Sequence, residues 1–81
     1  MSDDVKKRQS EQLTGVSNIA YDLMIVLSNK LEGIATMEDY RRDAQEAGDS
    51  DCSSLFERLQ RQDREAVDEL RGHLLKHLQA R

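Results

Sequence analysis

Three oxygen-donating side chains could meet at one height of a folded helical hairpin. Glu32 lies sixteen residues before Gly48, and Gln62 and Glu65 lie fourteen and seventeen residues after it. If the chain turns back at Gly48, equal distances from the turn mean equal heights, and a two-fold axis would add a second set. Carboxylates in a poorly hydrated place must take up protons, bind cations or stay solvated. Glu32, Gln62 and Glu65 are therefore the candidate ligands of a hard divalent cation bound weakly; the alternative is a set of hydrated charges near an interface.

Two other groups of polar residues have simpler explanations. Glu69, His73 and His77 recur every four residues, a spacing that can bind zinc, although histidines near a helix C-terminus also suit the helix dipole. Glu38 and Asp63 fall on the expected inner faces, where an unpaired acid is costly. We expect them to form salt bridges that fix the helix register, with partners drawn from the arginines Arg41, Arg42 and Arg58.

The elements that would position these residues are two long helices. The sequence contains no proline and four glycines, and it is rich in helix-forming residues. Residues 1–14 are polar, lack apolar periodicity and are expected to form a disordered arm. Residues 15–81 are expected to form a hairpin, with helices at about 16–47 and 51–78 joined by a turn at 48–50. In that turn Gly48 follows the first helix, and Asp49 or Ser50 caps the second.

The apolar residues predict a hairpin that does not remain alone. One stripe per helix closes the hairpin at a spacing of three and four residues. The first helix has further apolar residues outside its stripe, which make residues 19–27 apolar nearly all round. Because such a surface is normally covered, we expect an all-α protein that dimerises into a four-helix bundle. The first stripe comprises Val16, Ala20, Leu23, Met24, Leu27, Leu31 and Ile34, the second Cys52, Leu55, Phe56, Leu59, Ala66, Leu70 and Leu74, and the additional residues are Ile19, Tyr21, Ile25 and Val26.

Three segments carry a resemblance to a known superfamily. They are YDLMIVLSNKLEG at 21–33, YRRDAQEAGD at 40–49 and LFERLQRQDR at 55–64. Together they resemble the small two-helix members of the ferritin-like superfamily, over roughly residues 18–78. The resemblance implies a hairpin that pairs into a ferritin-like bundle. In the similar encapsulated ferritins, iron lies between subunits, on one Glu of the first helix and a Glu-x-x-His pair of the second.

The resemblance places the three iron ligands at positions where this chain keeps only one of them. Glu32 matches the first-helix ligand, whereas Gln62 and Glu65 replace the Glu and the His of the pair. Without the imidazole, ferroxidase activity is not expected. The function expected from the sequence is a ferritin-like oligomer with weak or vestigial binding of iron or another divalent cation between subunits. The alternative is a metal-free dimer that serves as a protein-interaction or stress-related scaffold module.

The composition of the chain excludes several classes of protein and disfavours some partners. Twelve basic and sixteen acidic residues give a net charge of −4, which does not favour nucleic acid or anionic lipid as a partner. The single cysteine excludes an intrachain disulfide scaffold and a cysteine-based zinc finger. No apolar run approaches the length of a membrane span. We therefore expect a cytoplasmic protein whose partner is another copy of itself, without nucleic acid or membrane.

Overall fold

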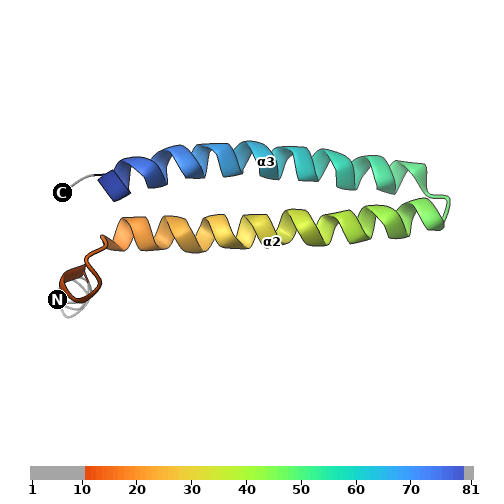
Figure 1. Ribbon diagram of the computed structural model, residues 1–81. Coiled ribbons are helices and arrows are strands. Elements are labelled where there is room, and N and C mark those ends of the chain that lie inside the picture. The colour runs from red at the N-terminus through yellow and green to blue at the C-terminus, as the bar shows by residue number, and fades with distance from the viewer. Residues whose placement is uncertain (1–10, 80–81) are drawn as a thin grey trace, which may run out of the picture.

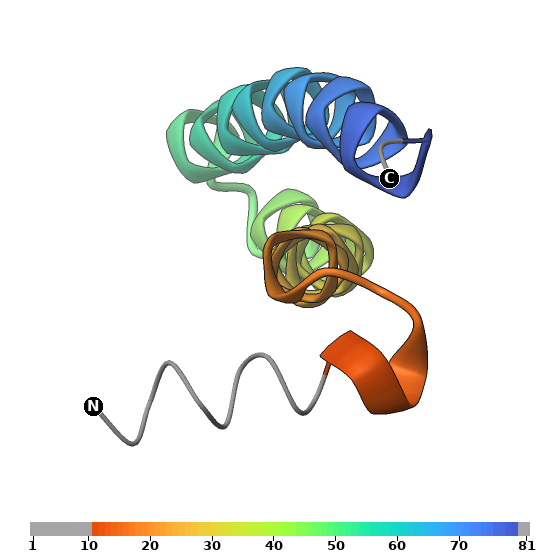
Figure 2. The same cartoon turned by 90° about the vertical axis from the view of Figure 1, so that its left-hand side faces the viewer.

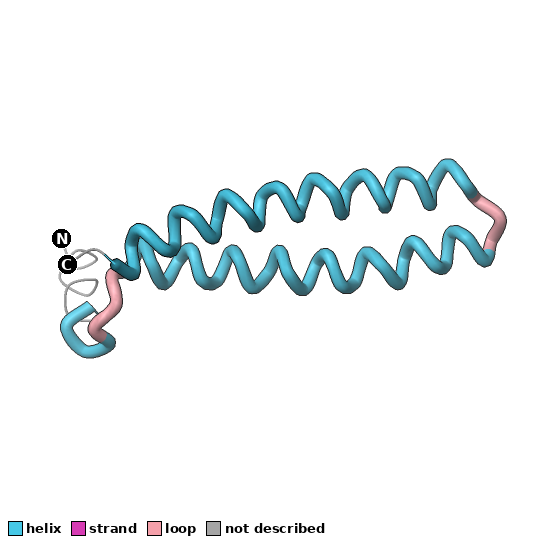
Figure 3. The backbone as a smooth tube through the Cα atoms, turned by 45° about the horizontal axis from the view of Figure 1, so that its top comes forward, coloured by secondary structure: helices cyan, strands magenta, loops and turns pink. Residues whose placement is uncertain are grey.

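The computed structural model describes residues 11–79, which form a hairpin of two long helices (Figure 1). Helix α2 spans Asn18–Glu46 and helix α3 spans Ser50–Gln79. They lie antiparallel along their whole length, with a short loop at one end (Figure 3). The predicted all-α hairpin is thus confirmed, with helix ends one or two residues from those expected. The structure holds one copy of the chain.

The turn between the helices is closed by backbone hydrogen bonds and one side chain. Gly48 has a φ of +74°, and the N–H groups of Gly48 and Asp49 donate to the carbonyls of Gln45 (3.1 Å) and Ala44 (2.9 Å). This pattern is a Schellman motif, which places glycine after the helix end. Asp49 Oδ1 then accepts a 3.0 Å hydrogen bond from the Cys52 N–H and caps α3. Asp49, one of the two expected caps, is the residue used.

The start of α2 differs from the expectation of a disordered arm at residues 1–14. Residues 1–10 lie outside the described residues, but residues 11–14 form a helical turn. After Gly15, at φ +72°, Ser17 caps α2 by accepting from the Ala20 N–H at 3.1 Å. The Glu11 carboxylate accepts from the Asn18 N–H at 2.9 Å. Two side chains therefore satisfy N–H groups that the first turn of a helix leaves free.

The two helices meet along a seam with a seven-residue repeat. On α2 it includes Ala20, Leu27, Ile34 and Arg41, all buried or half-buried. On α3 the half-buried residues Phe56, Asp63 and Leu70 recur at the same spacing. This repeat is the signature of antiparallel coiled-coil packing. Two residues assigned to the inner stripes, Leu31 and Leu55, are instead exposed.

The seam contains little that is fully enclosed. Among the described residues, the buried hydrophobic side chains are Ala20, at 0% exposure, and Ala44, at 7%. Viewed from the open end in Figure 2, α3 covers one side of α2 and leaves other sides uncovered. The remaining apolar side chains of the seam are half-buried, so within residues 11–79 the contact line between the helices encloses two alanines and no larger apolar side chain.

Candidate functional site

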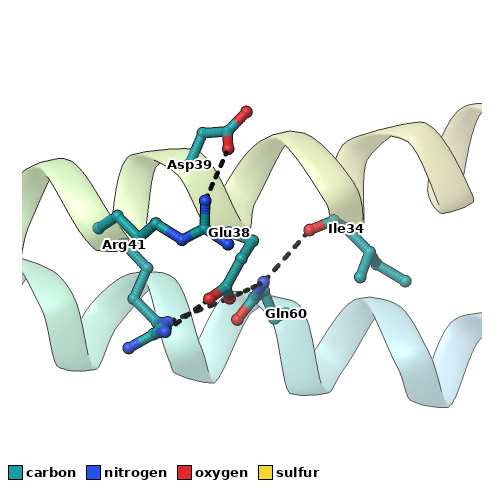
Figure 4. A network of polar contacts seen from close by, with 6 residues as sticks. Ile34, Glu38, Asp39, Arg41 and Gln60 are labelled. Carbon is teal, nitrogen blue, oxygen red and sulfur yellow. Dashed lines mark hydrogen bonds and ion pairs between the residues drawn. The ribbon is translucent and has the colours of Figure 1, made fainter.

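A polar network crosses the middle of the seam and ties the two helices together. The amide of Gln60, on α3, donates to the Ile34 carbonyl and to Glu38 Oε2 of α2, both at 3.2 Å. Arg41 Nε donates to the same Glu38 oxygen at 3.1 Å. Figure 4 shows Glu38, Arg41 and Gln60 converging between the helices. Gln60 is 6% exposed and was not singled out by the sequence reasoning.

The network perturbs the ionisation of Glu38. The hydrogen bond from Arg41, followed by the one from Gln60, lowers the Glu38 pKa from 4.5 to about 2. In return, the Glu38 carboxylate raises the pKa of Arg41. Arg41 was one of the three arginines expected to pair with this acid. The pair lies within α2, however, so the link to α3 is made by Gln60 rather than by a salt bridge of Glu38.

Acid is expected to weaken the hairpin through Glu38. Because folding lowers this pKa from 4.5 to about 2, the stabilisation is complete above pH 4.5 and is lost as the pH falls toward 2. The melting temperature, followed by circular dichroism from about pH 6 to about pH 2, should therefore fall less in Glu38→Gln than in the wild type. Glu69→Gln, at an exposed position of α3, is the matched control. An identical acid dependence in wild type and Glu38→Gln would contradict the network.

The second acid of the seam pairs with a lysine. Asp63 Oδ1 lies 3.1 Å from Lys30 Nζ, and this ion pair joins α3 to α2. Asp63 was expected to pair with Arg41, Arg42 or Arg58; that choice of partner is wrong. Lys30 lies eighteen residues before Gly48 and Asp63 fifteen after it, and the long lysine side chain spans this difference while remaining partly solvated. The pair is part-exposed, so it contributes more to register than to stability.

The candidate metal ligands do not converge within one chain. Glu32, Gln62 and Glu65 are all exposed. Glu32 is two residues from the seam position Lys30, and Glu65 two residues from Asp63, so each points about 200° away from the contact line. Among residues 11–79, no three His, Cys, Asp or Glu side chains are grouped as metal ligands. Any site using these residues would therefore need ligands from a second copy.

The donor chemistry of this set suits only one kind of metal. Two carboxylates and an amide offer oxygen ligands, which hard divalent cations accept. A redox iron centre of the ferritin-like kind would use an imidazole as well, and His73 and His77 lie farther along α3, both exposed. The residues present therefore fit a weak oxygen-ligated cation and do not fit a ferroxidase centre.

Cys52 does not have the surroundings of a nucleophile. It is half-buried in the first turn of α3, among Tyr40, Ala44 and Phe56, which line a groove at the turn end of the hairpin. The hydrogen bond and negative charge of Asp49, together with burial, raise the pKa of the thiol. Because the thiolate is the reactive form, a raised pKa makes the residue less reactive. Cys52 therefore packs between the helices at the turn end of the hairpin.

Exposed apolar side chains surround the first half of α2. Around the first half of α2, Ile19, Tyr21, Ile25 and Val26 are 45–58% exposed, as the sequence predicted. Leu31 adds to this surface at 51%. Monomeric proteins rarely leave a large continuous apolar area in water. These side chains are the candidate interaction site, and the polar network lies farther along α2, toward the turn.

Comparison with known proteins adds no family to this description. No family model, curated protein or solved structure matches the chain. The resemblance to two-helix ferritin-like proteins therefore depends on the three segments described above.

A membrane span is not part of the described fold. Neither of the helices formed by residues 18–46 and 50–79 has a stretch long and apolar enough to cross a bilayer.

Proposed function

We propose that this chain is one half of a helical dimer: two hairpins pair into a four-helix bundle of ferritin-like layout and function as a self-associating interaction module. The observation that supports this most directly is how few apolar side chains one hairpin buries and how many it leaves exposed. Two alanines are its buried hydrophobic side chains among residues 11–79, while ten large apolar residues are exposed. A second hairpin would cover part of this surface and supply the core that one hairpin lacks.

A dimer coupled to folding makes thermal stability depend on concentration. Raising the protein concentration tenfold should raise the melting temperature of the full chain by roughly 3–5 °C, because association stabilises the folded state by mass action. Circular dichroism over a range of concentrations measures this directly. A melting temperature that stays constant across the range would exclude association as the source of stability.

The proposal includes a weak divalent-cation site at the boundary between copies. Its support is the placement of Glu32, Gln62 and Glu65, exposed and close to one height of the hairpin. Because these residues face away from the chain's own seam, the site would form only in the assembly. Binding by so few oxygen ligands is expected to be weak, with a Kd on the order of millimolar.

Titration of the full chain with manganese chloride, followed by calorimetry, tests the cation site. We expect a heat of binding that disappears in Glu32→Ala and persists in Glu69→Ala, which removes another exposed carboxylate. Glu32→Ala should remain helical, since the residue lies outside the seam. If the wild type gives no heat at millimolar manganese, the cation site is rejected, and the chain is a metal-free interaction or scaffold module.

A further inference from the structure

A groove runs between α2 and α3 at the turn end of the hairpin. It has a volume of about 320 Å³, at the lower end of the range of about 300–1,000 Å³ for small-molecule sites. It extends over about two turns of each helix, a length that suits a compact molecule better than a long helix. This turn-end groove is lined by Tyr40, Asp43 and Ala44 on the α2 side and by Asp49, Cys52 and Phe56 on the α3 side.

The turn-end groove offers an apolar surface that includes two aromatic rings. The centroids of the Tyr40 and Phe56 rings lie 6.1 Å apart, and the rings are inclined at 54°. Phe56 is half-buried in the seam, whereas Tyr40 is 49% exposed and can contact a ligand. The small side chains of Ala44 and Cys52 leave the space beside the rings open. The faces of aromatic rings attract cations.

The charged groups that line the turn-end groove are acidic. Asp43 and Asp49 are its two carboxylates, and both are exposed. The hydrogen bond from the Cys52 N–H, followed by the one from its thiol, lowers the pKa of Asp49, so this carboxylate is charged at neutral pH. From Asp43 to Glu57 the chain has five acidic residues and no lysine, arginine or histidine. The charge around the groove is therefore negative.

The arginines on either side of this acidic segment do not neutralise the groove. The two at 41–42 already pair with Glu38 and Asp39 of their own helix. On α3 the first cation after the turn is Arg58. It lies two residues beyond Phe56, and so about 200° around the helix from this lining residue.

The helix ends at the turn do not reverse the charge. The last turn of α2 is the negative end of its dipole and contains no basic residue. The first turn of α3 is a positive end, but Asp49 caps it and Asp51 adds a second carboxylate. The turn-end groove therefore combines apolar side chains and an exposed aromatic ring with an excess of negative charge.

We infer that the turn-end groove binds a small organic cation with an apolar body, of the arylalkylammonium class. The apolar body would lie beside Tyr40 and Phe56, and the ammonium group toward Asp43. A cation on an exposed ring and an ion pair at the surface each contribute modestly, so we expect a Kd on the order of millimolar. The inference goes beyond the proposed function, because the exposed apolar side chains around the first half of α2 do not line this groove.

Titration of the full chain with phenethylammonium chloride, followed by the amide chemical shifts in NMR spectra, tests the inference. We expect saturable shifts for the amides of residues 40–56. Phenethyl alcohol has the same carbon skeleton without the charge and should bind about fivefold more weakly or less. Acetyl-lysine amide has the same charge without a ring and should bind about threefold more weakly or less.

Two variants locate the ligand within the groove. Asp43→Asn removes one carboxylate and should raise the Kd about threefold; Asp49 is left intact because it caps α3. Tyr40→Leu keeps an apolar side chain without an aromatic face and should also raise the Kd about threefold. The matched control is Asp22→Asn, which makes the same change in net charge about 30 Å away along α2. This distance exceeds the Debye length of about 8 Å, so the Kd should not change.

The comparison of ligands on the wild type decides the inference even if a variant loses helix in circular dichroism. Equal Kd values for phenethylammonium and phenethyl alcohol, or equal effects of Asp43→Asn and Asp22→Asn, would overturn the cation site. Tighter binding of acetyl-lysine amide than of phenethylammonium would assign the groove to a basic side chain of a protein partner and overturn the small-molecule ligand. Absence of amide shifts well above the expected Kd would reject binding in this groove.

Discussion

Replacing Ala44 with aspartate is expected to lower the free energy of unfolding by about 3 kcal/mol or more. Ala44 is 7% exposed, where α2 and α3 come together next to the turn. Arg41, three residues earlier on α2, already donates to Glu38, and burying an unpaired charge costs about 3 kcal/mol or more. A chain of this size has a total stability of roughly 4–12 kcal/mol. Far-UV circular dichroism at fixed protein concentration should therefore show a large loss of helix, or a melting temperature lowered by well over 10 °C.

The control for this change is Thr36→Asp. Thr36 is exposed on the same helix, so the new carboxylate stays hydrated and should change stability by no more than about 0.5 kcal/mol. Equal melting temperatures for Ala44→Asp and Thr36→Asp would mean that α2 and α3 are not packed together at the turn end as described.

Truncating Gln60 to alanine is expected to lower the free energy of unfolding by about 2 kcal/mol. The substitution removes two hydrogen bonds that cross the seam, to the Ile34 carbonyl and to Glu38, and leaves a gap where the side chain was enclosed. Urea unfolding at one fixed concentration measures the change. Gln62→Ala removes the same chemical group from an exposed position two residues away and should change the value by less than about 0.5 kcal/mol.

A third variant separates the hydrogen bonds from the packing at this position. Gln60→Leu keeps most of the side-chain volume but donates no hydrogen bond. It should restore part of the loss and still leave Glu38 with one donor fewer than in the wild type. If Gln60→Ala were as stable as Gln62→Ala, the amide would have no role in joining the helices.

The helices and the turn could be predicted because their signals are local. The absence of proline leaves long helices as the default, and Gly48 followed by Asp49 combines a helix end and a helix cap in two adjacent residues. The structure uses both as expected. The helical turn at residues 11–14 was not expected because this segment has no apolar periodicity of its own; the Glu11 carboxylate joins it to the start of α2 through the Asn18 N–H.

The polar seam could not be predicted in the same way. An angle of 100° per residue groups Leu31 with Leu27, but the helices follow a seven-residue repeat that brings Lys30 into contact instead. Lysine is an unusual seam residue, and it is tolerated because Asp63 lies opposite. Gln60 gave no signal beyond its spacing from Val67 and Leu74. Comparing distances from Gly48 would not have paired them either, because Lys30 lies eighteen residues before it and Asp63 fifteen after it.

The candidate metal ligands show a further limit of reasoning about one chain. Their heights in the hairpin followed from the distance to Gly48, but their directions depend on where the seam lies. With Lys30 and Asp63 in the seam, Glu32 and Glu65 point outward. A cation site built from these residues would therefore need oxygen ligands from a second copy of the chain.

Sedimentation equilibrium of the full chain at high micromolar concentration tests the proposed dimer most directly. We expect a particle of twice the 9.3 kDa chain mass, with the helical circular dichroism of the hairpin. A particle of 9.3 kDa that keeps its full helix content at the same concentration would contradict it, because the hairpin would then be stable with its apolar side chains in water.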